Sequence, residues 1–234
     1  MSSTLAPSST MIPSRVIGRS RAASGGELTL SEHDGEYTLR VDNWELMSSR
    51  KQGSEEAMAE VGCQQVRTNP AARVLVSGLG LGYSLRAALD VLHPEASVTV
   101  AEYVPEIIEW HAGPLGPLAG HPLDDPRVTL YSGDVRDVLT KHPNYFDVIL
   151  LDLDNGPQSF IDQSPKQLYS PTGLTVILRA LKGPKAVLVI WAAGHEVGFE
   201  KRMRQAGFSV EAIESPERKG GRGGNHVLYK GKRR

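Results

Sequence analysis

Three glycines alternate with leucines directly after a short apolar run. The run Val74–Val76 leads through Ser77 into Gly78, Gly80 and Gly82. A buried strand that enters a glycine turn and then a helix lets backbone N–H groups approach a ligand closely. We therefore predict that the three glycines bind a nucleoside cofactor. A tight turn without a ligand is the structural alternative.

An acidic residue ends the next apolar run. Glu102 follows the glycine turn by about 20 residues, where a carboxylate at a strand tip can accept both ribose hydroxyls of a nucleoside. A merely solvated charge is the alternative. Tyr103 comes next and is predicted to pack on the adenine. A dinucleotide site would need a glycine at the position of Tyr83, so the spacing favours an S-adenosyl cofactor over NAD.

Asp134 and Val135 follow the third apolar run, directly after Gly133. The Asp134 carboxylate could accept a hydrogen from the adenine amino group while the Val135 N–H meets a ring nitrogen. It could equally cap the helix that begins there, and one residue can do both. Both residues are therefore predicted to contact the cofactor.

Asp152, Asp154 and Asn155 end the fourth apolar run, beside a Gly-Pro turn. Carboxylates at this edge would face the crevice that holds a sulfonium carbon. They can bind an amine, accept its proton and favour the positive charge that passes from sulfur to nitrogen. Asp152 and Asp154 are therefore the predicted catalytic residues, and Asn155 a predicted substrate contact. The alternative is a helix cap with turn-forming residues.

Two further residues are assigned to the substrate, each with a structural alternative. Glu55 could line the cleft from the N-terminal portion or face water. Tyr169 could contact the substrate or belong to the core. No metal is predicted, because four of the histidines show no ligand spacing and the chain has a single cysteine, Cys63: these histidines are His111, His121, His142 and His195.

The elements that would position these residues alternate along the chain. Short runs rich in Val, Ile and Leu predict strands, and the segments between them predict helices. This pattern is typical of a doubly wound, mostly parallel α/β sheet of Rossmann-like type. The predicted strands are 73–77, 97–102, 127–131, 146–151 and 186–192, and the predicted helices are 82–92, 105–111, 134–141, 172–182 and 195–206. The runs FSVEAIES and HVLYK predict a closing antiparallel pair.

Three parts are predicted along the 234 residues. Residues 1–26 are rich in Ser, Ala, Pro and Arg and are predicted to be a disordered tail, with an organelle transit peptide as the alternative. Residues 27–69 hold a β-hairpin around Asp34-Gly35 and a helix. Residues 70–234 form the Rossmann-like cofactor-binding domain.

Bulk properties narrow the classes of partner. The formal net charge of −1 gives no general attraction to nucleic acid, and no apolar run has membrane-spanning length. One cysteine permits no internal disulfide, as expected for a reducing compartment. We therefore expect a cytoplasmic protein that acts on a small molecule, with neither nucleic acid nor membrane as its partner.

With these landmarks the chain resembles the spermidine synthase family, which shares the fold of class I S-adenosylmethionine-dependent methyltransferases. The resemblance runs from about Glu27 to Lys230 and includes the GLGLG turn, Glu102, Gly133-Asp134 and DVILLDLDNGP. It implies a homodimer assembled partly through the hairpin portion. It also implies cofactor roles for Gly78, Gly80, Glu102, Asp134 and Asp152.

Departures from the family pattern decide which reaction is expected. Leu81 stands where the family has an acid that helps favour a decarboxylated cofactor. Asn155 stands at the place of the family's catalytic Asp, with Asp154 one place early. Ser54-Glu55-Glu56 replaces the family's Tyr and its neighbouring acid or amide. These changes favour methyl transfer from S-adenosylmethionine to an amine or other small nucleophile. The alternatives are aminopropyl transfer from decarboxylated S-adenosylmethionine, which makes spermidine, and a non-catalytic binding or assembly protein.

Overall fold

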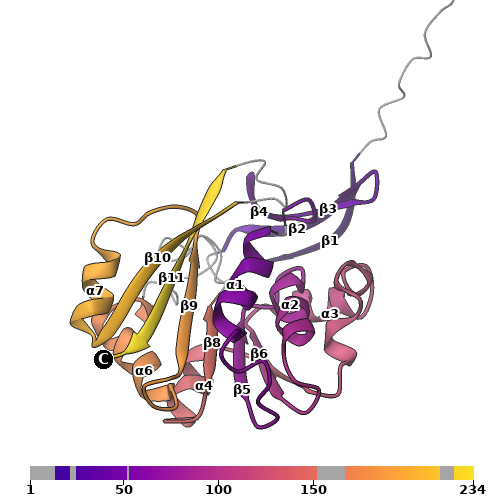
Figure 1. The fold of residues 1–234 in the computed structure, drawn as a ribbon. Helices are drawn as coiled ribbons and strands as arrows, with labels where there is room; N and C mark the ends of the chain where they lie inside the picture. The colour runs from indigo at the N-terminus through magenta and orange to yellow at the C-terminus, as the bar shows by residue number, and fades with distance from the viewer. Residues whose placement is uncertain (1–13, 22–24, 52, 152–166, 217–223) are drawn as a thin grey trace, which may run out of the picture.

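A seven-stranded sheet forms the centre of the computed structural model, which describes residues 14–21, 25–51, 53–151, 167–216 and 224–234 (Figure 1). The strand order is β10-β11-β9-β8-β5-β6-β7, and only β11 runs against the others. The predicted doubly wound α/β fold is confirmed. The strands are β5 (Arg73–Ser77), β6 (Ser97–Glu102), β7 (Val128–Ser132), β8 (Val148–Leu151), β9 (Val187–Ala192), β10 (Phe208–Pro216) and β11 (Asn225–Arg233).

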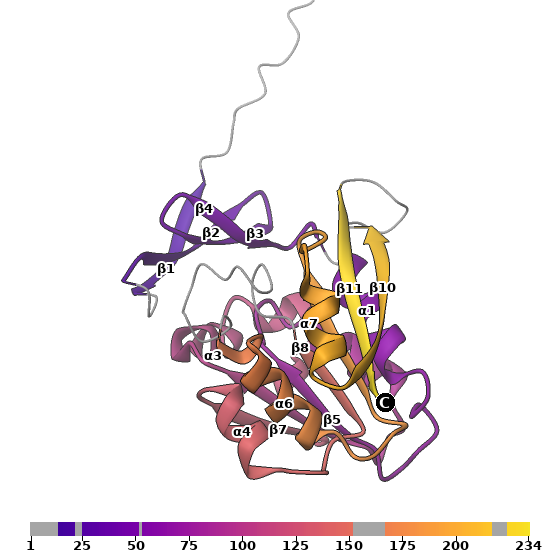
Figure 2. The ribbon, with the colours of Figure 1, turned by 90° about the vertical axis from the view of Figure 1, so that its left-hand side faces the viewer.

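Helices cover both faces of this sheet. Successive side chains of a strand point to opposite faces, so the apolar strands place apolar side chains on both faces, and both need cover. Val74 and Val76 belong to one buried cluster with α1 and α2, whereas Leu75 belongs to a second with α4 and α6. Figure 2 shows α4 and α6 in front of the sheet. The helices are α1 (Gly53–Cys63), α2 (Tyr83–Val91), α3 (Pro105–His111), α4 (Val135–Lys141), α6 (Pro171–Ala180) and α7 (Phe199–Gln205), with 3-10 helices η1 (Gly116–Ala119) and η2 (Pro122–Asp124).

A second, four-stranded antiparallel sheet precedes α1 and lies above the large sheet in Figure 1. The hairpin expected around Asp34 and Gly35 is present, and both residues have positive φ, as its two-residue turn requires. The strands are β1 (Arg15–Arg21), β2 (Glu27–His33), β3 (Glu36–Val41) and β4 (Trp44–Ser48). Strand β4 follows the hairpin and pairs antiparallel with β3.

Strand β1 lies inside the segment expected to be a disordered tail. It pairs antiparallel with β2 along its length and so satisfies backbone groups that β2 would otherwise present at a sheet edge. Its apolar and polar side chains show little alternation, because three arginines and one serine fill four of its seven positions. Gly18 of this strand also lies against the Trp110 ring of α3: a Cβ on Gly18 would come within 2.5 Å of Trp110 Nε1.

Helix α1 is packed on the large sheet, although the sequence grouped it with the hairpin. Gly62 permits the close approach, since a Cβ there would lie 2.5 Å from Leu150 Cδ2 of β8. Met58, Ala59 and Cys63 are buried on the same side. Burial raises the pKa of the Cys63 thiol to about 12, so this cysteine stays protonated and unreactive.

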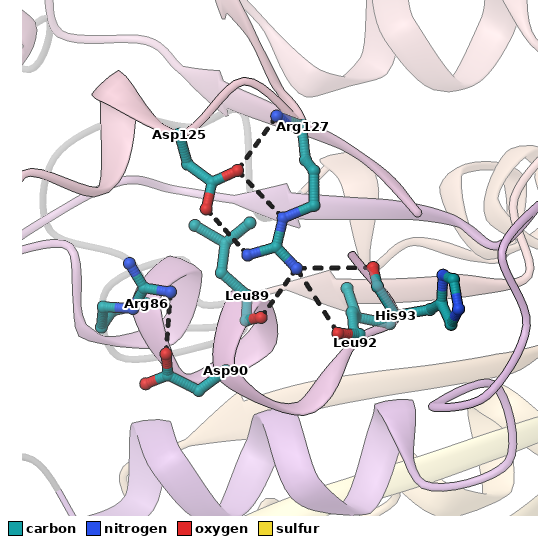
Figure 3. A network of polar contacts seen from close by, with 7 residues as sticks. All are labelled: Arg86, Leu89, Asp90, Leu92, His93, Asp125 and Arg127. Atoms are coloured by element: carbon teal, nitrogen blue, oxygen red, sulfur yellow. Dashed lines mark hydrogen bonds and ion pairs between the residues drawn. The ribbon is translucent and has the colours of Figure 1, made fainter. Parts of the chain in front are cut away.

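Arg127 joins the start of β7 to the end of α2 (Figure 3). Its guanidinium donates to the carbonyl of Leu89 at 2.9 Å and, more weakly, to those of Leu92 and His93, which lack helical partners. Asp125 accepts from Arg127 Nε at 2.9 Å and from Nη2 at 2.7 Å. This bidentate contact lowers the pKa of Asp125 to about 2.

We expect Arg127→Ala to lower the free energy of unfolding by about 2 kcal/mol, because it removes a charged donor from three carbonyls and leaves Asp125 unpaired. Urea unfolding at pH 7 measures this loss. The loss should shrink as pH falls from 3.8 towards about 2, since protonation of Asp125 then removes the ion pair from the unchanged protein as well.

Arg86→Ala is the matched control, because its ion pair with Asp90 is partly exposed and on the order of 0.5 kcal/mol is expected. Equal losses in the two variants would contradict the capping role of Arg127.

Among the described residues, no helix is both long and apolar enough to cross a membrane. Within those same ranges, no group of three or more His, Cys, Asp or Glu side chains could hold a metal ion.

Candidate functional site

The glycine turn joins β5 to α2 at the point where the sheet's connections change direction. From β5 the chain continues outward to β6 and β7, whereas β8 and β9 lie on the other side of β5. Ligands of open α/β sheets bind in the crevice at such a switch point. Gly80 and Gly82 have φ of 52° and 89°, and the Gly82 N–H donates to the Leu79 carbonyl at 2.8 Å. Only glycine adopts the second of these conformations without strain.

Glu102 holds this turn in place from the end of β6. Its Oε2 accepts from the N–H of Leu79 at 2.9 Å and of Gly80 at 3.4 Å, while Oε1 accepts from the N–H of Val104 at 2.8 Å. The residue is only 6% exposed. The structure thus brings together Glu102 and the glycine turn, and the role of both in cofactor binding stays a prediction.

Burial is the largest influence on the Glu102 carboxyl and raises its pKa. Four backbone amides, those of Val104, Leu79, Gly80 and Tyr103, lower it and partly offset this effect. A carboxylate offers about four lone-pair sites, and backbone amides take most of those of Glu102. The side chain therefore anchors the glycine turn, and its contact with a ribose stays a prediction.

The predicted adenine contacts lie along the same edge of the sheet. Tyr103 is 47% exposed just beyond β6. Asp134 caps α4 by accepting from the Arg136 N–H at 2.8 Å, and its other oxygen accepts from Arg136 Nη2 at 2.6 Å. Val135 is buried at the start of the helix. Asp134 thus caps the helix, as its alternative interpretation expected. Contact with the adenine stays a prediction for Tyr103, Asp134 and Val135.

The predicted catalytic residues fall after the last described residue of β8. Leu151 pairs with Ser77, so the end of β8 lies next to the start of the glycine turn. Asp152, Asp154 and Asn155 lie outside the described residues. Their catalytic, cofactor and substrate roles stay predictions.

Glu55 and Tyr169, the two remaining substrate predictions, lie in different surroundings. Glu55, in the first turn of α1, lines a small pocket with the glycine-turn residues Leu79, Gly80 and Leu81. Tyr169 is 1% exposed, and its ring packs edge-on against Phe199 in the core cluster behind the sheet. Glu55 thus lies beside the glycine turn and its contact with a substrate stays a prediction, whereas the position of Tyr169 matches its core alternative.

Sequence reasoning missed two residues that support the glycine turn. His111, at the end of α3, is 4% exposed, and its Nε2 lies 2.9 Å from the Gly80 carbonyl oxygen. Met47 of β4 covers Gly80 from above: a Cβ on that glycine would lie 2.7 Å from the Met47 sulfur. Neither residue belongs to a spaced motif, so no local pattern could have found them.

His111 should make the stability of the fold depend on pH. Burial lowers its pKa from the ordinary value of 6.5, and the nearby His121 adds to this effect, while the hydrogen bond to Gly80 opposes it. The unfolded chain therefore takes up the proton first, and the free energy of unfolding should fall as pH drops below 6.5. His111→Gln, which retains an amide donor for Gly80, should flatten this pH dependence in urea unfolding.

His33→Gln is the control for this measurement, because His33 is exposed at the end of β2. An unchanged slope in His111→Gln would show that another group carries the pH dependence.

Solved structures that are similar to this chain in fold include spermidine synthases. A spermidine synthase in complex with the transition state analogue AdoDATO matches 93% of this chain and 73% of its own, with a TM-score of 0.75 at 18% identity. The chain has the spermidine synthase fold. The Thermotoga maritima enzyme matches with a TM-score of 0.70 at 17% identity, over 93% of this chain and 72% of its own.

The spermidine-synthase-like chain also has curated relatives by sequence. The polyamine aminopropyltransferase of Korarchaeum cryptofilum is 31% identical over 98 residues, 42% of this chain and 30% of the relative. That of Thermoanaerobacter sp. is 34% identical over 79 residues, 34% of this chain and 28% of the relative. The matches thus span less than a third of each relative. No family model matches the chain. The resemblance to spermidine synthases is confirmed in both sequence and fold.

Proposed function

We propose that the spermidine-synthase-like chain transfers an aminopropyl group from decarboxylated S-adenosylmethionine to an amine. The observation that carries the proposal is the sequence similarity to polyamine aminopropyltransferases in a chain whose glycine turn is bound to a buried strand-end carboxylate. The sequence alone favoured methyl transfer over aminopropyl transfer, and the order of these two candidate reactions is now reversed. The substrate is a small amine, and the chain acts as a homodimer.

In this reaction the lone pair of the amine nitrogen attacks the carbon bonded to the sulfonium sulfur. The C–N bond forms as the C–S bond breaks. The electron pair of the C–S bond stays on the sulfur and neutralises its positive charge. Positioning of the two reactants supplies much of the rate. Glu102 binds the ribose, Tyr103 and Asp134 contact the adenine, and Asp152 and Asp154 orient the acceptor amine and take its proton.

Methyl transfer from S-adenosylmethionine is the second candidate. The observation in its favour is Leu81, whose buried apolar side chain lies in the glycine turn where the family has an acid. No carboxylate at that position repels the methionine carboxylate. The two candidates differ in their products, which makes them separable.

The test incubates the full chain with putrescine and either decarboxylated or intact S-adenosylmethionine, with mass spectrometry of the products. We expect spermidine and 5′-methylthioadenosine from the decarboxylated cofactor. A methylated amine with S-adenosylhomocysteine would establish methyl transfer instead, and no product from either cofactor would overturn both. Full spermidine synthesis by Asp154→Asn would remove Asp154 from the role of base.

A further inference from the structure

The carboxylate of Glu55 and the first residues of α2 line one small pocket. Its other walls are Met47 of β4 and the glycine-turn residues Leu79, Gly80 and Leu81, while Tyr83 and Ser84 begin the helix. Two helices thus start at this point, since Glu55 lies in the first turn of α1. The pocket adjoins the turn at which the proposed nucleoside binds.

A chain of hydrogen bonds leads from this carboxylate into the interior. Ser54 Oγ donates to Glu55 Oε2 at 2.9 Å, and His226 Nδ1 lies 2.9 Å from Ser54 Oγ. Ser54 is 1% exposed, so its hydroxyl is held inside the protein. The Trp191 ring of β9 contacts the His226 ring of β11, with centroids 4.6 Å apart. The Ser54 side chain, which holds Glu55, is therefore fixed by residues far away in the sequence.

The start of α2 lines the pocket and is electropositive, because the first N–H groups of a helix have no partner within the helix. Gly82, the residue at its N-cap, has no side chain to neutralise them. Such a helix end would attract the carboxylate of a bound amino acid. In this chain the protein supplies a carboxylate of its own there, and that carboxylate repels a second anion but attracts an ammonium group.

We propose that Glu55, positioned by Ser54 and His226, is a specificity-determining residue that selects a sulfonium nucleoside with a cationic tail over one whose tail also carries a carboxylate. This inference rests on the proposed function and deepens it. Glu55 supplies the discrimination that Leu81 cannot. An apolar side chain neither attracts an ammonium group nor repels a carboxylate.

The test is isothermal titration of the full chain with three ligands: decarboxylated S-adenosylmethionine, intact S-adenosylmethionine, and 5′-methylthioadenosine, which has no charged tail. We expect the unchanged protein to prefer the decarboxylated ligand by about tenfold or more, which corresponds to about 1.4 kcal/mol. Glu55→Gln should remove most of this preference and leave the affinity for 5′-methylthioadenosine unchanged.

Glu56→Gln is the matched control. It removes the same charge from the same helical turn, but Glu56 lines a separate groove with Glu60 and Arg86 and should keep the preference. Ser54→Ala should weaken the preference by releasing Glu55, and Ser54→Thr should restore it, because threonine keeps the hydroxyl.

The outcomes separate the two proposals. If Glu55→Gln binds 5′-methylthioadenosine normally and still prefers the decarboxylated ligand as the unchanged protein does, the selector role is overturned while the proposed function stands. If the unchanged protein binds none of the three ligands, the proposed function is overturned and the selector role with it.

Discussion

Glu102→Gln should reduce the affinity for 5′-methylthioadenosine about 100-fold. Both carboxylate oxygens accept from backbone amides, so one of them must become an NH2 group that faces another donor. The unsatisfied donor destabilises the free and the bound protein alike, whereas the loss of a charged acceptor for the ribose costs about 1.5–3 kcal/mol of binding free energy. At about 1.4 kcal/mol for each factor of ten, the upper part of this range gives the expected loss of affinity.

Isothermal titration measures this affinity, with circular dichroism to check that the variant remains folded. Glu109→Gln is the control, since it removes the same charge from an exposed position on α3 nearby. An affinity of Glu102→Gln within about threefold of the unchanged protein would remove Glu102 from the nucleoside site.

Gly82→Ala should lower the free energy of unfolding by about 3 kcal/mol. Its φ of 89° is strained for any residue with a Cβ, at roughly 1–2 kcal/mol. The new Cβ would also lie 2.9 Å from His111 Cε1 and 3.1 Å from Ala119 Cβ, and overpacking of this kind costs about 1–3 kcal/mol. Because the crowding pushes on the glycine turn, nucleoside affinity should fall as well.

Gly120→Ala separates the two contributions in urea unfolding. Gly120 also has a positive φ, 63°, but nothing lies within 4 Å of the place that a Cβ would take there, so only the backbone strain of about 1 kcal/mol should appear. Equal losses in the two variants would show that crowding at Gly82 is relieved without cost.

The sequence predicted the large sheet well because its strands are buried on both faces. The predicted strands 73–77 and 97–102 match β5 and β6 residue for residue, since polar residues or turn formers bound each apolar run. Strand β1 was missed because its arginines and serines give no clear alternation. Its pairing with β2 is a tertiary effect that a local pattern does not contain.

The candidate site was predictable where it depends on backbone geometry. Gly80, Gly82 and Glu102 come together because two parallel neighbouring strands end at the same edge. The support from His111 and Met47 was not predictable, because each reaches the turn from an element whose position the sequence does not specify. The same holds for the link between Ser54 and His226, which are 172 residues apart.

Met47 makes the small N-terminal sheet a wall of the pocket beside the glycine turn. Its sulfur covers Gly80, and Gly18 of β1 is seated against Trp110 of α3, so the small sheet contacts both the glycine turn and a helix beside the large sheet. Strand β4 therefore helps to shape the pocket beside the glycine turn. A substitution before residue 50 can change cofactor affinity without ever touching the cofactor.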